Sequence, residues 1–267
     1  MPRRTQLTAM VGLAALALAG CSSTASETGS STSAEPEATP TVELVEDGVL
    51  TMCANPPYEP FTYEVDGEVV GFEVDIVREV AFDLDVELEI VSTPFEGLES
   101  GQDLETRKCD VVASGITITD EREERLDFAD PHFDADQGLL VPAGSGLASL
   151  EDLEGLTVGV QQSTTGEDWA EEEGLTTVQF EDLGLQVEAL RAGQVDAIVN
   201  DIAVLGPYVD EDLEVGATFP TGEQYGIGVR TGNTALLDAV NATLERIHED
   251  GTYDTLYEQH IGTAPTA

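Results

Sequence analysis

Apolar and polar positions alternate along most of the chain with two periods, that of strands and that of helices. Short runs of apolar or alternating residues predict strands at 49–54, 86–91, 110–114, 157–160, 177–180, 196–200 and 225–229. Apolar residues at 72, 76, 77, 80, 81 and 84 have helical spacing, and further helices are expected from about 94 and at 165–172, 185–192 and 234–249. Strands therefore alternate with helices along nearly the whole chain.

This alternation predicts an α/β fold in which strands pair in parallel. The rhythm occurs twice, which indicates two similar α/β lobes. If the late strand returns to the first lobe, the chain passes between the lobes twice and a cleft lies between them. We expect lobe 1 at 42–132 and 226–263, lobe 2 at 133–225, and hinge segments at about 131–136 and 221–226.

A different pattern precedes the first strand. Arg3 and Arg4 form a basic segment, and an apolar run at 9–20 follows before Cys21. This run is shorter than the roughly 20 residues that span a bilayer. Residues 1–20 are therefore expected to be a signal peptide, exported by the general or the twin-arginine route.

The end of the leader resembles a bacterial lipobox, in Leu18-Ala19-Gly20-Cys21. This resemblance implies that Cys21 is lipidated and tethers the protein to the outer face of a membrane without spanning it. Residues 21–41 consist mainly of Ser, Thr, Ala, Glu and Pro. Such a segment buries too little apolar surface to fold, so we expect a disordered, lipid-anchored tether.

Acidic residues dominate the composition. The chain has 54 Asp and Glu against 10 Lys and Arg, for a formal net charge of −44. Such a surface repels phosphates, which argues against nucleic acid and against adsorption to anionic lipid headgroups. Lys108 is the one lysine; this scarcity resembles adaptation to high salt, but composition does not establish the habitat. The charge bears on solubility and does not identify a ligand.

Two cysteines remain after Cys21 is assigned to lipid. Cys53 and Cys109 form an even pair in an exported chain, which is typical of a disulfide. Both also flank apolar, strand-like runs, where a free cysteine packs as a small core residue. The sequence leaves these two alternatives open.

Candidate chemistry gathers where the predicted strands end, because ligands of open parallel sheets bind beyond the carboxyl ends of the strands. Gly115, Thr117 and Arg122 follow one such strand, and Asp201 follows another. A guanidinium holds a carboxylate with two hydrogen bonds, and a carboxylate accepts from an ammonium, so a cleft with this pair suits an α-amino acid. Taken alone, Arg122 is most simply a solvated partner for helix carboxylates, and an aspartate in the position of Asp201 is more often a helix N-cap.

A series of short motifs runs through the chain in a fixed order: Pro57-Tyr58-Glu59-Pro60-Phe61, Gly71-Phe72-Glu73-Val74-Asp75, Pro94-Phe95-Glu96-Gly97, Cys109-Asp110-Val111-Val112-Ala113, Gly115-Ile116-Thr117-Ile118-Thr119-Asp120-Glu121-Arg122, Leu126-Asp127-Phe128-Ala129-Asp130-Pro131, Gln224-Tyr225-Gly226-Ile227 and Asp250-Gly251-Thr252-Tyr253-Asp254. By the order and spacing of these motifs, the chain resembles the bacterial extracellular solute-binding proteins of family 3, which deliver polar amino acids to ABC transporters, over about residues 48–263. The resemblance implies a two-lobed periplasmic-binding-protein-like fold of type II. In this fold, two parallel-type sheets with flanking helices are joined by a two-segment hinge.

The resemblance also implies roles for individual residues. Arg122 grips the α-carboxylate, with contributions from Gly115 and Thr117, and Asp201 takes the α-ammonium. Tyr58 and Phe95 are implied to sandwich the ligand's side chain. Thr164 and Thr165 are implied to form the second-lobe turn that completes the carboxylate site, and Asn55 and Gln161 to contact the far end of the ligand. Without the resemblance, aromatic residues such as these are more often core or loop packing, and the threonines are more often helix caps.

Two departures from the family pattern stand out. The segment between Phe95 and Asp110 is about two residues longer and more polar, which leaves the helix after Phe95 in doubt. His132 stands where an aromatic residue is usual, and we interpret it as structural.

The expected function is that of an extracytoplasmic lipoprotein that hands a polar amino acid to the permease of an ABC importer, as a monomer. The alternatives are an exported lyase or dehydratase of the same fold and an amino-acid sensor. The Asp210-x-Asp212-x-Glu214 spacing weakly suggests calcium, but Val215 stands where such a loop needs glycine. We therefore expect no catalytic residue, no cofactor and no metal site. The identity of the amino acid stays open: Asn55 and Gln161 suggest a neutral side chain such as glutamine, and the acidic surface suggests lysine or arginine.

Overall fold

A computed structural model of the chain describes residues 42–262. The predicted signal peptide, the lipid attachment at Cys21 and the tether lie outside the described residues. Within them, none of the helices combines the length and the apolar character that a membrane crossing requires.

The first of two five-stranded sheets has the strand order β4-β1-β5-β12-β6. Its strands are β1 (Val49–Ala54), β4 (Glu87–Ser92), β5 (Val111–Val112), β6 (Leu126–Phe128) and β12 (Gly228–Arg230). Its side also holds a hairpin and six helices, namely β2 (Tyr63–Val65), β3 (Glu68–Val70), α1 (Phe72–Asp83), α2 (Phe95–Glu99), α3 (Gln102–Glu105), α4 (Asp120–Glu123), α8 (Thr234–Asp250) and α9 (Thr252–His260). All of β1 except its first residue is buried, as expected of a strand covered on both faces.

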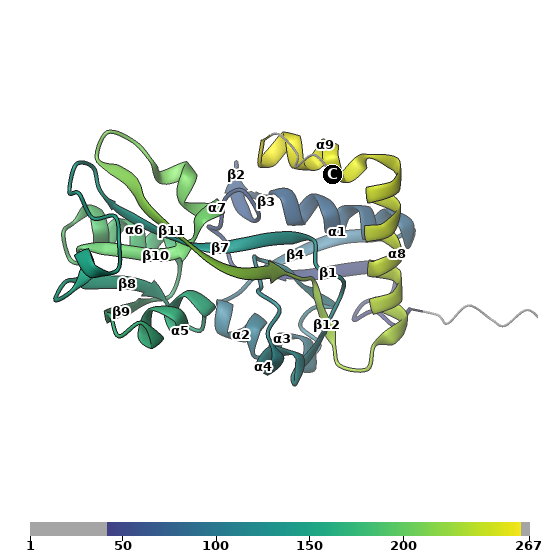
Figure 1. The fold of residues 1–267 in the computed structure, drawn as a ribbon. Coiled ribbons are helices and arrows are strands. Elements are labelled where there is room, and N and C mark those ends of the chain that lie inside the picture. Colours follow the sequence, from purple (N-terminus) through teal and green to yellow (C-terminus); the bar gives the residue numbers. More distant parts are fainter. Residues whose placement is uncertain (1–41, 263–267) are drawn as a thin grey trace, which may run out of the picture. The chain divides into compact units, whose positions relative to one another are not determined.

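The second sheet has the order β11-β7-β10-β8-β9. Its strands are β7 (Phe133–Pro142), β8 (Thr157–Gln161), β9 (Thr176–Phe180), β10 (Ala197–Asp201) and β11 (Leu213–Tyr225). The helical segments on its side are η1 (Glu151–Leu153), α5 (Thr165–Glu172), α6 (Leu183–Arg191), α7 (Ile202–Leu205) and η2 (Gly206–Tyr208). Figure 1 shows the elements of the two sheets on opposite sides, with β7 and β11 running between them.

Local sequence explains where the principal helices begin. In α5, α6 and α8 the residue before the helix, respectively Thr164, Asp182 and Asn233, accepts a hydrogen bond from a backbone N–H of the first turn. The apolar face of α1 is buried as its spacing predicts. α8 ends at Asp250 and is followed by Gly251, whose φ of +81° suits glycine.

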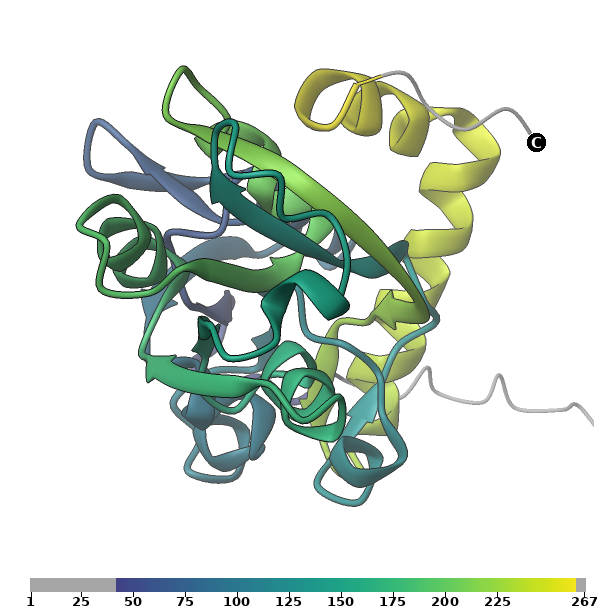
Figure 2. The same ribbon diagram turned by 60° about the vertical axis from the view of Figure 1, so that its left-hand side comes forward.

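The chain passes from the first sheet to the second between β6 and β7 and returns between β11 and β12 (Figure 2). The prediction of one strand at 225–229 was wrong, because Tyr225 ends β11 in the second sheet and Gly228 begins β12 in the first. The α/β class agrees with the prediction, and β1 pairs in parallel with β4 and β5. The sheets are mixed rather than parallel throughout. The strands β7, β11 and β12 pair antiparallel. β7 and β12 each follow a direct passage between the sheets, and β11 follows β10 after only the short α7 and η2, so none of the three comes after a long helical crossover.

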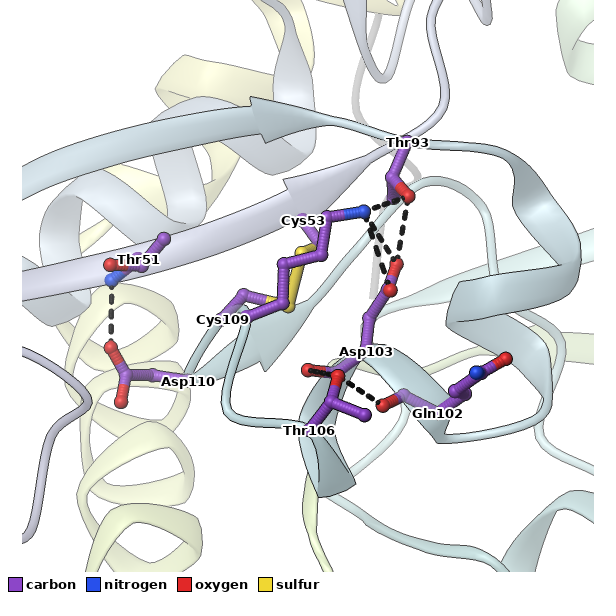
Figure 3. The surroundings of a disulfide bond; sticks show 9 residues. Thr51, Cys53, Thr93, Gln102, Asp103, Thr106, Cys109 and Asp110 are labelled. Carbon is purple, nitrogen blue, oxygen red and sulfur yellow. Dashed lines mark hydrogen bonds and ion pairs between the residues drawn. A yellow bond between two sulfur atoms is a disulfide. The ribbon is translucent and has the colours of Figure 1, made fainter.

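A disulfide joins Cys53 on β1 to Cys109, just before β5, with their Cα atoms 5.7 Å apart (Figure 3). Both cysteines are buried, so they also occupy the core position that was the alternative. Beside the bridge, Thr93 donates to a carboxylate oxygen of Asp103 at 2.9 Å. The longer, polar segment before Cys109 forms α2 and then α3, separated by Gly101 at a φ of +71°.

Candidate functional site

One pocket lies where the strand ends of the two sheets meet, and every ligand-binding residue predicted from the sequence lines it. These residues are Asn55, Tyr58, Phe95, Gly115, Thr117, Arg122, Gln161, Thr164, Thr165 and Asp201. The lining also includes Ser114, Gln137, Gly166 and Asn200. The cavity has a volume of about 10 Å³, which is close to the space of one water molecule.

Arg122 is buried on the first-sheet side of the pocket, with 5% of its surface exposed. Its guanidinium donates to the backbone oxygen of Thr117 at 2.9 Å and, across the pocket, to that of Ser163 at 3.0 Å. It also lies 5.5 Å from the ring centroid of Phe95. Burial lowers the pKa of Arg122, because a low dielectric disfavours the cation.

Arg125, rather than Arg122, is the arginine that pairs with carboxylates at the surface. The guanidinium of Arg125 lies 2.7 Å from Glu121 and 3.6 Å from Glu99. Arg122 instead turns inward from the same stretch of acidic residues. An arginine that is buried against backbone oxygens keeps its charge available to an anion in the pocket.

Asp201 ends β10 on the second-sheet side and is 6% exposed. Its Oδ2 accepts from the hydroxyls of Tyr58 and Tyr225, both at 2.5 Å, and its Oδ1 accepts from Nε2 of Gln137 at 2.5 Å. Burial raises the pKa of Asp201 to about 6, while the tyrosine hydrogen bonds act in the opposite direction. Asp201 precedes α7, but its side chain makes no capping hydrogen bond there.

The loop at Gly115 requires a glycine. Its φ is +64°, and a Cβ at this position would lie 2.3 Å from Cε1 of Tyr58. The Gly115 N–H donates to Oε2 of the buried Glu73 at 2.7 Å. Further along the loop, the hydroxyls of Thr117 and Thr165 lie 3.4 Å apart and link the two sides of the pocket.

The turn that opens α5 contributes the N-terminus of this helix to the pocket. Thr164 caps the helix by accepting from the N–H of Glu167 at 3.2 Å, and it donates to the backbone oxygen of Gln161 at 2.7 Å. Thr165 is the first helical residue. Free N–H groups and the helix dipole make such a terminus favourable for an anion.

A pair of amides bridges the pocket. Nε2 of Gln161 donates to Oδ1 of Asn55 at 3.0 Å, from one side of the pocket to the other. The lining thus combines an arginine, a carboxylate and two amides that are hydrogen-bonded to each other.

The model of the bacterial extracellular solute-binding proteins, family 3, matches residues 50–263 of the chain. The chain belongs to this family. A probable histidine-binding protein of Neisseria gonorrhoeae is 31% identical over 98% of this chain and 97% of its own length. The ABC transporter glutamine-binding protein GlnH of Bacillus subtilis is 35% identical over 74% and 75%. A solved structure of an ancestral arginine-binding protein bound to arginine has 37% identity and a TM-score of 0.76, with 80% of this chain and 99% of that chain covered.

The family assignment confirms the resemblance read from the motifs, and the solved structure confirms the fold class. The relatives are named for binding different amino acids, so membership of the family does not identify the ligand of this solute-binding protein.

Some polar groups at the pocket were not predicted. Gln137 comes from the middle of β7 and Tyr225 from the last position of β11, and both donate to Asp201. Asn200 precedes Asp201, and its Oδ1 lies 3.1 Å from the same Tyr58 hydroxyl that donates at shorter distance to Asp201. The family motif contains Tyr225 and the strand-end rule includes Asn200, so both carried a signal, whereas Gln137 had none.

His132 has a structural place, as expected. Its ring Nε2 lies 3.0 Å from Oε1 of Glu73, and both side chains are fully buried. Glu73 in turn accepts from Gly115, so this pair supports the pocket loop from behind without lining the pocket.

The residues suggested for calcium form an ordinary turn. Asp210 accepts from the backbone N–H groups of Asp212 and Leu213 and lies 2.7 Å from Arg191. Residues 42–262 contain no group of three or more His, Cys, Asp and Glu side chains that could hold a metal ion.

Proposed function

We propose that this solute-binding protein binds one free α-amino acid in the pocket and delivers it to the permease of an ABC importer. One observation carries the proposal. Among the described residues that line the pocket, Arg122 and Asp201 are the charged ones, and they have opposite signs. This pair matches the carboxylate and the ammonium of a zwitterion, and the relatives named for amino acids support the same ligand class.

In this proposal the guanidinium of Arg122 exchanges its backbone contact with Ser163 for the ligand's carboxylate. Thr117 and the N-terminus of α5 add donors for the same group. Asp201 takes the ammonium in place of a tyrosine hydroxyl. Tyr58 and Phe95 pack against the ligand's side chain.

Entry of the ligand requires the two sides of the pocket to separate, because the cavity of about 10 Å³ does not hold an amino acid. The segments at 131–136 and 221–226 are the proposed hinge, where β7 and β11 pass between the sheets and their register shifts between Phe219 and Glu223. A ligand that contacts both sides favours the closed state, since it interacts less with the open one.

The proposal places the protein outside the cytoplasm, anchored to the membrane through lipid on Cys21. The leader sequence and the extracytoplasmic family support this location. Without its leader the chain keeps its excess of acidic residues, which disfavours nucleic acid as a partner. We propose that it acts as a monomer.

Thermal-shift screening of the purified protein against the common amino acids tests this function. A ligand that binds only the folded state raises the melting temperature by mass action. At least one amino acid should do so, and Arg122→Ala should abolish the shift while Arg125→Ala keeps it. If no amino acid raises the melting temperature, the proposed function is wrong. If Arg122→Ala responds as the wild type does, the carboxylate contact is wrong.

Mass spectrometry of the ligand after incubation distinguishes binding from catalysis. Recovery of the unchanged amino acid is expected. A product formed by elimination would assign the chain to the alternative, an exported lyase or dehydratase.

A further inference from the structure

The amide of Asn55 presents its oxygen to the pocket. Its Nδ2 donates to the backbone oxygen of Thr93 at 3.0 Å. Because a backbone carbonyl only accepts, this contact decides which way the amide points. The Oδ1 of Asn55 therefore faces Gln161.

The amide of Gln161 is oriented independently, from the second sheet. Nε2 of Gln186 donates to backbone oxygens of β8 and β10 at 3.2 and 3.1 Å, so its Oε1 accepts from Nδ2 of Asn200 at 2.8 Å. The same Nδ2 of Asn200 lies 3.5 Å from Oε1 of Gln161. Gln161 therefore turns its donor, Nε2, toward Asn55. The hydrogen bonds to neighbouring residues thus fix the orientation of both amides. An acceptor, Oδ1 of Asn55, and a donor, Nε2 of Gln161, therefore lie side by side.

The described residues that line the pocket offer no charge for the ligand's side chain beside the amides of Asn55 and Gln161. Arg122 and Asp201 are the charged ones, and an α-amino acid uses both for its own carboxylate and ammonium. Glu73 does not line the pocket. One of its carboxylate oxygens accepts from the N–H of Gly115, and the other is hydrogen-bonded to the ring of His132. A charged ligand side chain would be buried here without a counter-ion, which is strongly unfavourable.

We infer that the pocket selects an amino acid whose neutral side chain ends in a carboxamide, as in glutamine. The ligand's NH₂ donates to Oδ1 of Asn55, and its oxygen accepts from Nε2 of Gln161, so the carboxamide replaces the direct bond between these residues. A guanidinium or ammonium has donors only and meets the N–H of Gln161. A carboxylate has acceptors only and meets the oxygen of Asn55. This inference rests on the proposed function.

Calorimetric titration of the purified protein with glutamine, arginine, lysine, glutamate and methionine tests the inference. Glutamine should bind tighter than the three charged amino acids by on the order of 100-fold or more. Methionine, which is similar in length but lacks the amide, should bind at least about tenfold more weakly. If arginine, lysine or glutamate binds as tightly as glutamine, this inference is overturned while amino-acid binding stands. If no amino acid binds, the proposed function fails with it.

Two variants place a carboxylate at the amide pair of Asn55 and Gln161, from opposite sides of the pocket. Asn55→Asp and Gln161→Glu should each lower the affinity for glutamine and raise that for arginine, so that the ratio changes by about tenfold or more. Because each acts from a different sheet, one remains informative if the other does not fold. Asn241→Asp on α8 is the control, since Oδ1 of Asn241 accepts from the N–H of Asp130 at 2.8 Å outside the pocket, and it should leave the ratio unchanged. Folded variants that both keep the wild-type preference would overturn the inference.

Discussion

Replacement of Asp201 by asparagine should make the protein more stable above about pH 6 while weakening its ligand binding. Burial raises the pKa of this carboxyl from 3.8 to about 6. Each pKa unit corresponds to about 1.4 kcal/mol, so the ionised carboxylate costs the folded state roughly 3 kcal/mol. Asparagine removes this cost but loses the bond from Gln137, worth about 1 kcal/mol. The net gain of about 2 kcal/mol corresponds to a rise in melting temperature of roughly 4–8 °C.

The pH dependence separates this explanation from a general effect of the substitution. Since the pKa of Asp201 is higher in the folded than in the unfolded state, its stabilising contribution is present below about pH 4 and is lost as the pH rises through about 6. The difference in unfolding free energy between Asp201→Asn and wild type should therefore grow by about 2 kcal/mol between pH 4 and pH 8. Other carboxylates titrate alike in both proteins and cancel in the difference.

Urea denaturation at pH 4, 6 and 8 measures this difference, and calorimetry with the ligand measures binding. The variant should lose affinity by on the order of 100-fold, because the ammonium loses its counter-ion. A variant that is less stable than wild type at pH 8, or a difference that does not change with pH, would refute a desolvated carboxylate at this site.

Three further expectations follow from the same structure. Ligand affinity of the wild type should fall by up to about tenfold per pH unit below about pH 6, as Asp201 takes up a proton; calorimetry that finds constant affinity down to pH 5 would contradict the ammonium contact. Gly115→Ala should lower the melting temperature more than Gly193→Ala and should also weaken ligand binding. Both glycines have a φ of +64°, but of the two only Gly115 has a tyrosine ring where the added Cβ would lie. Equal melting temperatures and affinities of the two variants would argue against this steric role of Gly115. Joint replacement of Cys53 and Cys109 by alanine should lower the unfolding free energy by about 4 kcal/mol, from the separation of 56 residues; an unchanged urea midpoint would count against the bridge.

Much of the secondary structure was predictable because its causes are local. The helical spacing of apolar residues placed α1 within one residue of its observed end, and Thr164 could be recognised as a helix cap before α5. The rule that ligands lie beyond parallel strand ends, together with the family motif, selected Arg122 and Asp201 from a chain rich in charge. Neither the rule nor the motif depends on knowing how the two sheets face each other.

The tertiary structure decided which distant groups meet. Gln137 sits in the middle of a long strand, and only the antiparallel pairing of β7 with β10 brings it opposite Asp201. The sequence left Cys53 and Cys109 open between a bridge and two core residues, since spacing alone does not measure the distance between strands. The polarity of the amides at Asn55 and Gln161 likewise depends on partners from other strands and helices. Periodicity along the chain reports which face of an element is buried, whereas the partner of a buried polar group depends on three-dimensional packing.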